Sequence, residues 1–133
     1  MLRLGYTVFY VPDVRKTVDF YTAAFGVEMR YMHPSGEYAE MATGETLLAF
    51  SGEALVKASL LGDLNYHRNR PDSDPIGAQP AFIVDNLERA IEKALAAGAV
   101  LVTKPDAKPW GQTVAFIRDI NGVLVELCTP PIR

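Results

Sequence analysis

The feature that most constrains the fold of this 133-residue chain is an order of elements that occurs twice. Each half reads as a strand, an amphipathic helix and three further strands. The strand-to-helix junctions match, with Val-Pro-Asp-Val at 11–14 and Val-Asp-Asn-Leu at 84–87. The helix ends match as well, with Phe-Gly-Val at 25–27 and Ala-Gly-Ala at 97–99. Two such repeats predict two small sheets that share a core or cleft.

Both predicted helices carry clear start and stop signals. Asp13 and the pair Asp85–Asn86 are suitable N-caps, and Gly26 and Gly98 are suitable stops. The first helix has an apolar stripe at intervals of three and four residues, at Val14, Val18, Tyr21 and Phe25. The second has a similar stripe at Leu87, Ala90, Ile91, Ala94 and Leu95.

The strands and turns complete the two modules. Strands are expected at residues 4–11, 27–32, 37–41 and 46–50, and again at 79–84, 100–103, 113–117 and 123–128. A longer turn is expected at 104–111, and a tight Asn-Gly turn at 119–122. We therefore expect one α+β domain over residues 1–133, with module one at about 1–52, a linker at about 53–77 that holds a short helix around 54–61, and module two at about 78–133. The alternative is a ferredoxin-like α+β domain whose halves are similar by chance.

Composition narrows the classes of partner. The formal net charge of −3 argues against nucleic acid or an anionic membrane surface as the main partner. No run of residues approaches the roughly 20 apolar residues of a membrane span. Cys128 is the single cysteine, so no disulfide can form within the chain, and the cytoplasm is the expected compartment. We expect a small-molecule ligand, with no nucleic acid and no membrane partner.

Three motifs, in order, resemble one family. Residues 6–21, with Asp-Phe-Tyr at 19–21, look like the opening of a glyoxalase-type module, and residues 81–87 look like the opening of a second. Pro-Trp-Gly at 109–111, followed by residues 118–127, resembles its closing hairpin. The chain thus resembles the vicinal-oxygen-chelate superfamily of glyoxalases, bleomycin-resistance proteins and extradiol dioxygenases. The resemblance implies two tandem βαβββ modules whose mixed sheets form an open, barrel-like cleft, often in a homodimer.

The same resemblance implies a place for a metal. In the family's metalloenzymes four inward side chains, usually His or Gln, Glu, His and Glu, hold a divalent ion that acts as a Lewis acid. Carried over by position, these places fall on Tyr6, Ala49, Gln79 and Glu126. Only Glu126 keeps the usual residue type, while Ala49 offers no donor and Tyr6 offers a phenol, which is protonated at neutral pH. The set is therefore interpreted as degenerate and no cofactor is expected; a divalent metal held weakly or shared between chains is the alternative.

Glu126 is the candidate catalytic residue. Its strand neighbours Val125 and Leu127 point to the opposite face, so its carboxylate is directed inward among apolar residues. Such a carboxylate is costly unless it is paired or protonated. It could act as a general base, a hydrogen-bond acceptor for a ligand or a residual metal ligand. The structural alternative is a carboxylate paired with a donor such as Tyr6 or Gln79.

The candidate ligand-binding residues are mainly aromatic. Tyr6 and Tyr10 share one face of the first strand, and with Gln79 and Glu126 they would form a pocket with aromatic walls and a few polar groups. Trp110 lies in the loop before a strand, where it could cover a ligand. Ordinary core packing is the alternative for the tyrosines, and packing over the end of the barrel is the alternative for the tryptophan.

Two functions follow from these residues, and both stay open. The first is a metal-independent protein of the bleomycin-resistance kind that sequesters a small, partly aromatic ligand. The second is a metal-dependent glyoxalase-like lyase, isomerase or dioxygenase that uses Glu126. A partner domain with no ligand is a third possibility. The absence of most of the metal ligands favours the first, although the fold alone decides nothing about function.

Overall fold

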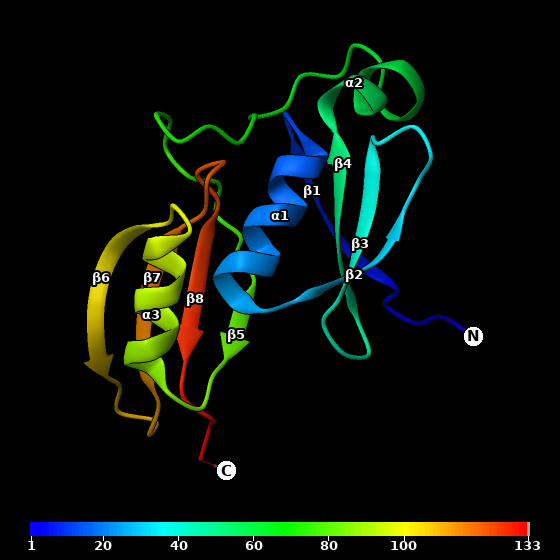
Figure 1. The fold of residues 1–133 in the computed structure, drawn as a ribbon. Helices are drawn as coiled ribbons and strands as arrows, with labels where there is room; N and C mark the ends of the chain where they lie inside the picture. Colours follow the sequence, from blue (N-terminus) through cyan, green and yellow to red (C-terminus); the bar gives the residue numbers. More distant parts are fainter. Residues whose placement is uncertain (133) are drawn as a thin grey trace. The chain divides into compact units, whose positions relative to one another are not determined.

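The computed structural model describes residues 1–132, and the chain divides into two compact units, Met1–Arg68 and Asn69–Arg133. Each unit holds one four-stranded mixed sheet that is not closed, with one longer helix beside it (Figure 1). This confirms the predicted α+β class and the two βαβββ modules. No helix within residues 1–132 is long and apolar enough to cross a bilayer.

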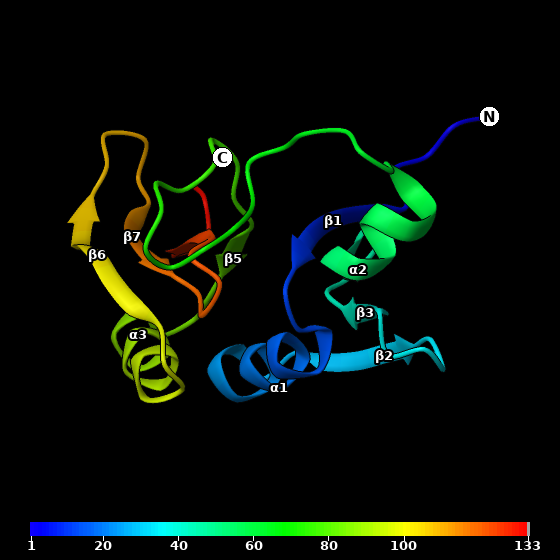
Figure 2. The ribbon, with the colours of Figure 1, turned by 90° about the horizontal axis from the view of Figure 1, so that it is seen from above.

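The first unit begins with the predicted order of elements. Its elements are β1 (Tyr6–Val11), α1 (Val14–Phe25), β2 (Glu28–Met32), β3 (Tyr38–Ala42) and β4 (Leu47–Gly52). The strand order is β1-β4-β3-β2, with β1 parallel to β4 and the other pairs antiparallel. Helix α1 contacts β2, β3 and β4 and covers one face of this sheet (Figure 2).

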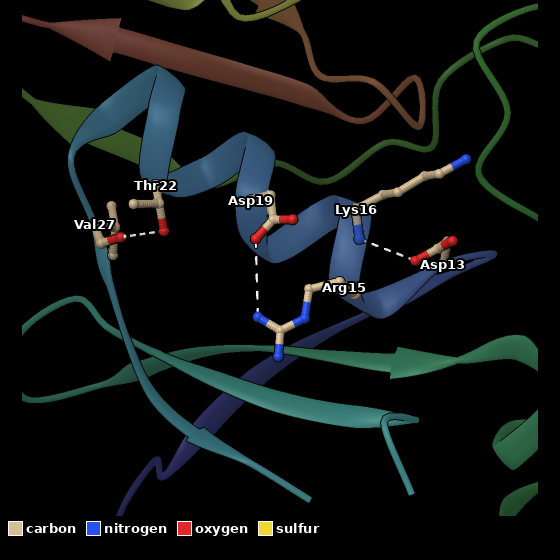
Figure 3. Close-up of polar contacts among 6 residues, drawn as sticks. All are labelled: Asp13, Arg15, Lys16, Asp19, Thr22 and Val27. Atoms are coloured by element: carbon tan, nitrogen blue, oxygen red, sulfur yellow. Dashed lines mark hydrogen bonds and ion pairs between the residues drawn. The ribbon is translucent and has the colours of Figure 1, made fainter.

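Helix α1 begins and ends where the sequence predicts. The Asp13 side chain accepts a hydrogen bond of 2.9 Å from the Lys16 backbone N–H, which satisfies one of the unpaired groups of the first turn (Figure 3). Gly26 adopts a left-handed conformation with φ 70° and ends the helix. The Thr22 hydroxyl donates to the carbonyl of Val27 at 2.9 Å, which holds the chain as it turns toward β2.

The core of the first unit lies between α1 and its sheet. Tyr21 is fully buried, and its ring lies 4.9 Å from that of Phe50 on β4, in a tilted arrangement. Phe9 and Val11 are buried on β1. Burial of an aliphatic or aromatic side chain of this size contributes roughly 2 kcal/mol, so the helix is held mainly by its apolar stripe.

The segment after β4 belongs to the first unit. It forms α2 (Glu53–Leu55) and then η1, a π-helical turn at Val56–Leu60, close to the short helix expected at 54–61. The Leu61 N–H donates to the Val56 carbonyl five residues earlier, which is the π-helical pattern. The loop proper runs from residue 61 to residue 80, later than the predicted linker.

The second unit repeats the order. Its elements are β5 (Ala81–Ile83), α3 (Leu87–Ala96), β6 (Val100–Ala107), β7 (Thr113–Arg118) and β8 (Leu124–Cys128). The strand order β5-β8-β7-β6 mirrors that of the first sheet, again with a parallel outer pair. Helix α3 contacts β6 and β8 (Figure 2), and the Asn86 side chain caps it by accepting from the Arg89 N–H at 3.1 Å.

Two predicted boundaries in this unit are wrong. The turn expected at 104–111 begins later, because β6 continues through Ala107 and pairs Asp106 with Val114. Pro105 favours a turn, but β6 is an edge strand with irregular register, where a residue without an N–H is tolerated. The strand expected at 79–84 covers only Ala81–Ile83.

The turn between β7 and β8 is fastened to the start of the second unit. Gly122 has φ 88°, and the Arg118 guanidinium donates to the carbonyls of Gly122 at 2.9 Å, Arg70 at 3.2 Å and Ser73 at 2.6 Å. The Asp119 side chain accepts from two backbone N–H groups of the same turn. One arginine therefore joins a hairpin to a segment almost 50 residues earlier in the chain.

Candidate functional site

Alternating side-chain directions along β1 and β8 separate a helix-facing side of each sheet from an open side. On β1, Phe9 and Val11 are buried while Tyr6 is 52% exposed. On β8, Val125 and Leu127 are buried and Glu126 between them is half-buried. Tyr6 and Glu126 therefore lie on the open sides of their own sheets, as their sequence neighbours predict.

Glu126 is paired within the second unit. Its Oε1 accepts a hydrogen bond of 2.9 Å from Nε2 of Gln79, which lies just before β5. The backbones of the two strands are in register here, with Ala81 beside Glu126. The structure thus brings two predicted site residues together. Gln79 is the donor that pairs with the Glu126 carboxylate, as in the structural alternative for this residue. An amide-bound carboxylate on an open face can also accept a hydrogen bond from a ligand at its second oxygen.

The carboxylate affects a neighbour on the same side of β8. Burial raises the pKa of the Cys128 thiol, and the hydrogen bond and the charge of Glu126 raise it further. A thiol with a raised pKa is mostly protonated at neutral pH, so it is a poor nucleophile. Cys128 therefore serves here as a small buried residue.

The first unit holds the other two positions. Tyr6 stands at the exposed start of β1, and Ala49 on β4 has no exposed surface and no donor atom. Tyr10 on the same side of β1 contacts Tyr66 edge to face, with ring centroids 5.3 Å apart. The Arg68 guanidinium lies over the Tyr66 ring at 4.8 Å. Tyr66 extends the aromatic surface and was not predicted, because it lies in a polar loop with no periodicity.

Trp110 lies in the tight loop between β6 and β7. It is 61% exposed, and its indole N–H donates to the Gln112 side chain at 2.9 Å. The neighbouring Gly111 has φ 96° and lies against Ile132. The ring is thus held at the surface by a polar contact, and its role in covering a ligand stays a prediction.

A second polar cluster on the first sheet was missed. Glu40 on β3 lies directly opposite Ala49, and its Oε2 accepts a hydrogen bond of 2.9 Å from the Tyr38 hydroxyl. A hollow of about 380 Å³ borders Glu40, Tyr6 and Arg30. The signal was present in the sequence, because Tyr38 and Glu40 alternate with buried Ala39 and Met41, but no family motif marks these positions.

Tyr38 is strongly perturbed by this environment. Its pKa is raised well above the ordinary value, first by burial and then by the hydrogen bond and the charge of Glu40. Tyr6 and Tyr31 add smaller effects in the same direction. The three tyrosines and the carboxylate therefore influence one another on the open side of this sheet.

The side chains at the four family positions do not fit a tight divalent site. They supply a phenol, a methyl group, an amide and a carboxylate, and the last two bind each other. Within residues 1–132, no group of three or more His, Cys, Asp and Glu side chains could hold a metal ion. His33 is engaged with Ser35 in an exposed turn, and His67 is exposed in the loop. Tight structural and catalytic sites normally use three or four such ligands.

Comparison of the sequence with known proteins identifies its family. A family model described as the Glyoxalase/Bleomycin resistance protein/Dioxygenase superfamily matches residues 3–127. The lactoylglutathione lyase of Escherichia coli O157:H7 is 28% identical over 130 residues, which cover 95% of this chain and 91% of that protein. A probable lactoylglutathione lyase of Vibrio cholerae is 27% identical over 128 residues, covering 94% and 88%.

Solved structures agree on the fold. A glyoxalase/bleomycin resistance protein/dioxygenase family enzyme from Burkholderia phytofirmans superposes with a TM-score of 0.82 at 19% identity, covering 96% of this chain and 98% of that one. TioX from Micromonospora sp. ML1 superposes with a TM-score of 0.74 at 20% identity, covering 96% and 98%. Together with the family match, the repeated βαβββ units show that the chain belongs to the glyoxalase/bleomycin resistance protein/dioxygenase superfamily.

Proposed function

We propose that this protein binds a small, partly aromatic molecule on its open sheet faces without a tightly held divalent metal. The observation that carries the proposal is the donor set. Ala49 has no donor, and Gln79 directs its amide N–H at the one family-type carboxylate, Glu126. A phenol, a methyl group and an amide leave Glu126 as the single anionic side chain of the set, whereas tight divalent sites normally use three or four His, Cys, Asp or Glu ligands.

The remaining surface is suited to an organic ligand. Tyr6 and Tyr10 give the open side of the first sheet an aromatic surface with hydroxyl groups at its edge. In the second unit Glu126 supplies a hydrogen-bond acceptor and Trp110 an exposed aromatic ring. Small-molecule sites commonly combine apolar or aromatic walls with a few such polar groups. Gln79 would orient Glu126 and offer its own carbonyl oxygen.

A second candidate is an enzyme, and the named relatives favour it. Two of them are called lactoylglutathione lyase or probable lactoylglutathione lyase, and both align with nearly the whole chain. In this case Glu126 would be the general base or a residual metal ligand, in a glyoxalase-like lyase, isomerase or dioxygenase. The lyase activity would be assayed with and without added metal, using Glu126→Gln as the test variant.

We also propose a cytoplasmic homodimer as the working form. Family members often pair their modules between chains, and the predicted degenerate site could be completed in that way. Sedimentation at several protein concentrations would measure the oligomeric state. A monomer at micromolar concentration would contradict this part of the proposal.

Metal binding is the first experiment. Protein purified without chelator or affinity tag is analysed for metal and then titrated with nickel, zinc, cobalt, manganese and iron(II). We expect no binding in the micromolar range, and stabilisation by aromatic ligands in a thermal-shift screen. Glu126→Ala should reduce that stabilisation, whereas Glu88→Ala, an exposed position at the start of α3, should not. Stoichiometric metal that is lost in Glu126→Ala would overturn the proposal and support the enzyme.

A further inference from the structure

The open side of the first sheet carries a carboxylate, Glu40, that is not at any of the four places implied for metal ligands. Across this sheet Ala49 on β4 lies beside Glu40 on β3, and Glu40 in turn lies beside Tyr31 on β2. Ala49 holds the place at which the resemblance puts an acidic ligand. The acidic group in this unit is therefore one strand away, in the middle of the sheet and bordered by aromatic residues.

The contacts of Glu40 leave part of its carboxylate available. Oε2 accepts from the Tyr38 hydroxyl at 2.9 Å, while Oε1 accepts no hydrogen bond from the described residues. The Tyr31 and Tyr38 rings lie 6.5 Å apart. Tyr31 is 44% exposed and Tyr6 is similarly exposed, and neither hydroxyl has a hydrogen-bond partner within residues 1–132. One carboxylate oxygen and three phenol rings thus meet at an accessible surface.

Charged side chains of both signs border the hollow beside this group, with Glu45 and Glu40 on one hand and two arginines on the other. Every cause of the shift in Tyr38 raises its pKa, and the Glu40 charge is among them. A guanidinium close to that hydroxyl would lower the pKa instead. Arg3 and Arg30 border the adjoining hollow, but Arg30 forms no ion pair with Glu40 among the described residues. The carboxylate is therefore not neutralised by either arginine at contact distance.

We propose that Glu40, with Tyr6, Tyr31 and Tyr38, forms a binding site for the protonated amine of a small organic molecule. An ammonium group donates strong hydrogen bonds to a carboxylate, and it is attracted to the faces of aromatic rings. The adjoining hollow of about 380 Å³ is bordered by Leu4, Tyr6 and Leu47 as well as by charged side chains, and it has room for the rest of such a ligand. This inference rests on the proposed small-molecule binding and names the class of ligand.

Three probes of similar shape and different charge test the site. Benzylammonium, benzyl alcohol and benzoate are titrated separately into ¹⁵N-labelled protein at pH 7, with amide chemical shifts as the readout. We expect benzylammonium to bind about tenfold more tightly than the alcohol, because a charged hydrogen bond contributes more than a neutral one. Its largest shifts should fall on β1, β2 and β3. Equal binding of the alcohol, preference for benzoate, or no binding of benzylammonium would overturn the proposal.

A matched pair of variants locates the effect. Glu40→Gln keeps an acceptor for the Tyr38 hydroxyl and removes only the charge, so it should weaken benzylammonium about tenfold and leave the alcohol unchanged. Glu88→Gln makes the same charge change on α3 and should alter neither. Tyr31→Ala changes an exposed ring and should weaken benzylammonium about threefold. Equal amine affinity in Glu40→Gln would contradict the proposal.

The two proposals can fail separately. If the thermal-shift screen yields a ligand that depends on Glu126, but benzylammonium does not bind or binds equally well to Glu40→Gln, small-molecule binding is supported and the amine site is wrong. If no ligand stabilises the protein but benzylammonium binds and depends on Glu40, the amine site is supported and the role of Glu126 is wrong.

Discussion

The two sheets share their topology and differ in where they place a carboxylate. In the second unit Glu126 lies on β8, next to the short parallel strand, and Phe116 is its neighbour on β7. In the first unit Ala49 takes the place of Glu126, and Glu40 takes the place of Phe116. The helix-facing sides are apolar in both. The comparison shows that packing constrains one side of each sheet, whereas acidic and apolar residues can exchange places on the other.

The turns that precede the last strand of each sheet also differ. Gly44 and Gly122 both have positive φ, but a Cβ on Gly44 would meet no atom within 4 Å. A Cβ on Gly122 would fall 2.2 Å from the Arg70 carbonyl oxygen. One turn is open, and the other is pressed against backbone that Arg118 holds in place. The predictions below test these two contrasts.

The largest effect is expected at the turns. Gly122→Ala should lower the free energy of unfolding by about 3 kcal/mol, since both the backbone angle and the space are unsuitable. Gly44→Ala should cost about 1 kcal/mol, from the backbone angle alone. Urea unfolding of both variants measures the difference. Equal losses would mean that the contact with Arg70 adds nothing.

A carboxylate introduced at position 49 on β4 should lower the stability of the protein. Ala49→Glu places a second charge at a position with no exposed surface and directly opposite Glu40, so we expect a loss of about 2 kcal/mol. Adding Glu40→Gln should recover about half of this loss. A double-mutant cycle by urea unfolding gives the coupling, and additive losses would show that the two carboxylates do not interact.

The arginine that holds the second turn should matter less than the glycine. Arg118→Lys keeps the charge and loses the fork of donors, so we expect a loss of about 1 kcal/mol and faster amide exchange at residues 70–73. Arg15→Lys on α1 is the control, because Arg15 makes only an exposed contact of 3.8 Å with Asp19 (Figure 3). Unchanged exchange at 70–73 would contradict this anchoring role.

The smallest effect concerns ionisation in the second sheet. Glu126→Gln removes a negative charge beside Cys128, so the thiol pKa should fall toward its ordinary value while staying raised by burial. Alkylation of Cys128 followed against pH should then reach half of its maximal rate at a lower pH than in the unaltered protein. A curve that does not move would show that burial alone sets this pKa.

Much of the backbone could be predicted from the sequence, because its signals are local. The caps at Asp13 and Asn86, the stop at Gly26 and the apolar stripes follow from the chemistry of neighbouring residues. The π-helical turn at Val56–Leu60 and the full length of β6 could not be predicted in this way. Both depend on pairing and packing with other parts of their units.

In the candidate site, too, the features that depend on neighbouring residues could be predicted, and those that depend on the fold could not. Alternation placed Tyr6 and Glu126 on open faces, and the family positions drew attention to Gln79. The pairing of Gln79 with Glu126 was one of several alternatives, since only the fold fixes which donor is in reach. Glu40 was missed, because its meaning depends on the register that sets it beside Ala49.

The parallel outer pairs have a consequence for synthesis on the ribosome. In each sheet the first strand pairs with the last one made, β1 with β4 and β5 with β8. Neither sheet can be completed until its whole module has emerged, but the first needs nothing beyond Gly52 for its strand pairs. The nascent chain can therefore assemble one sheet while the other is still being translated, which limits mispairing between two modules of similar pattern.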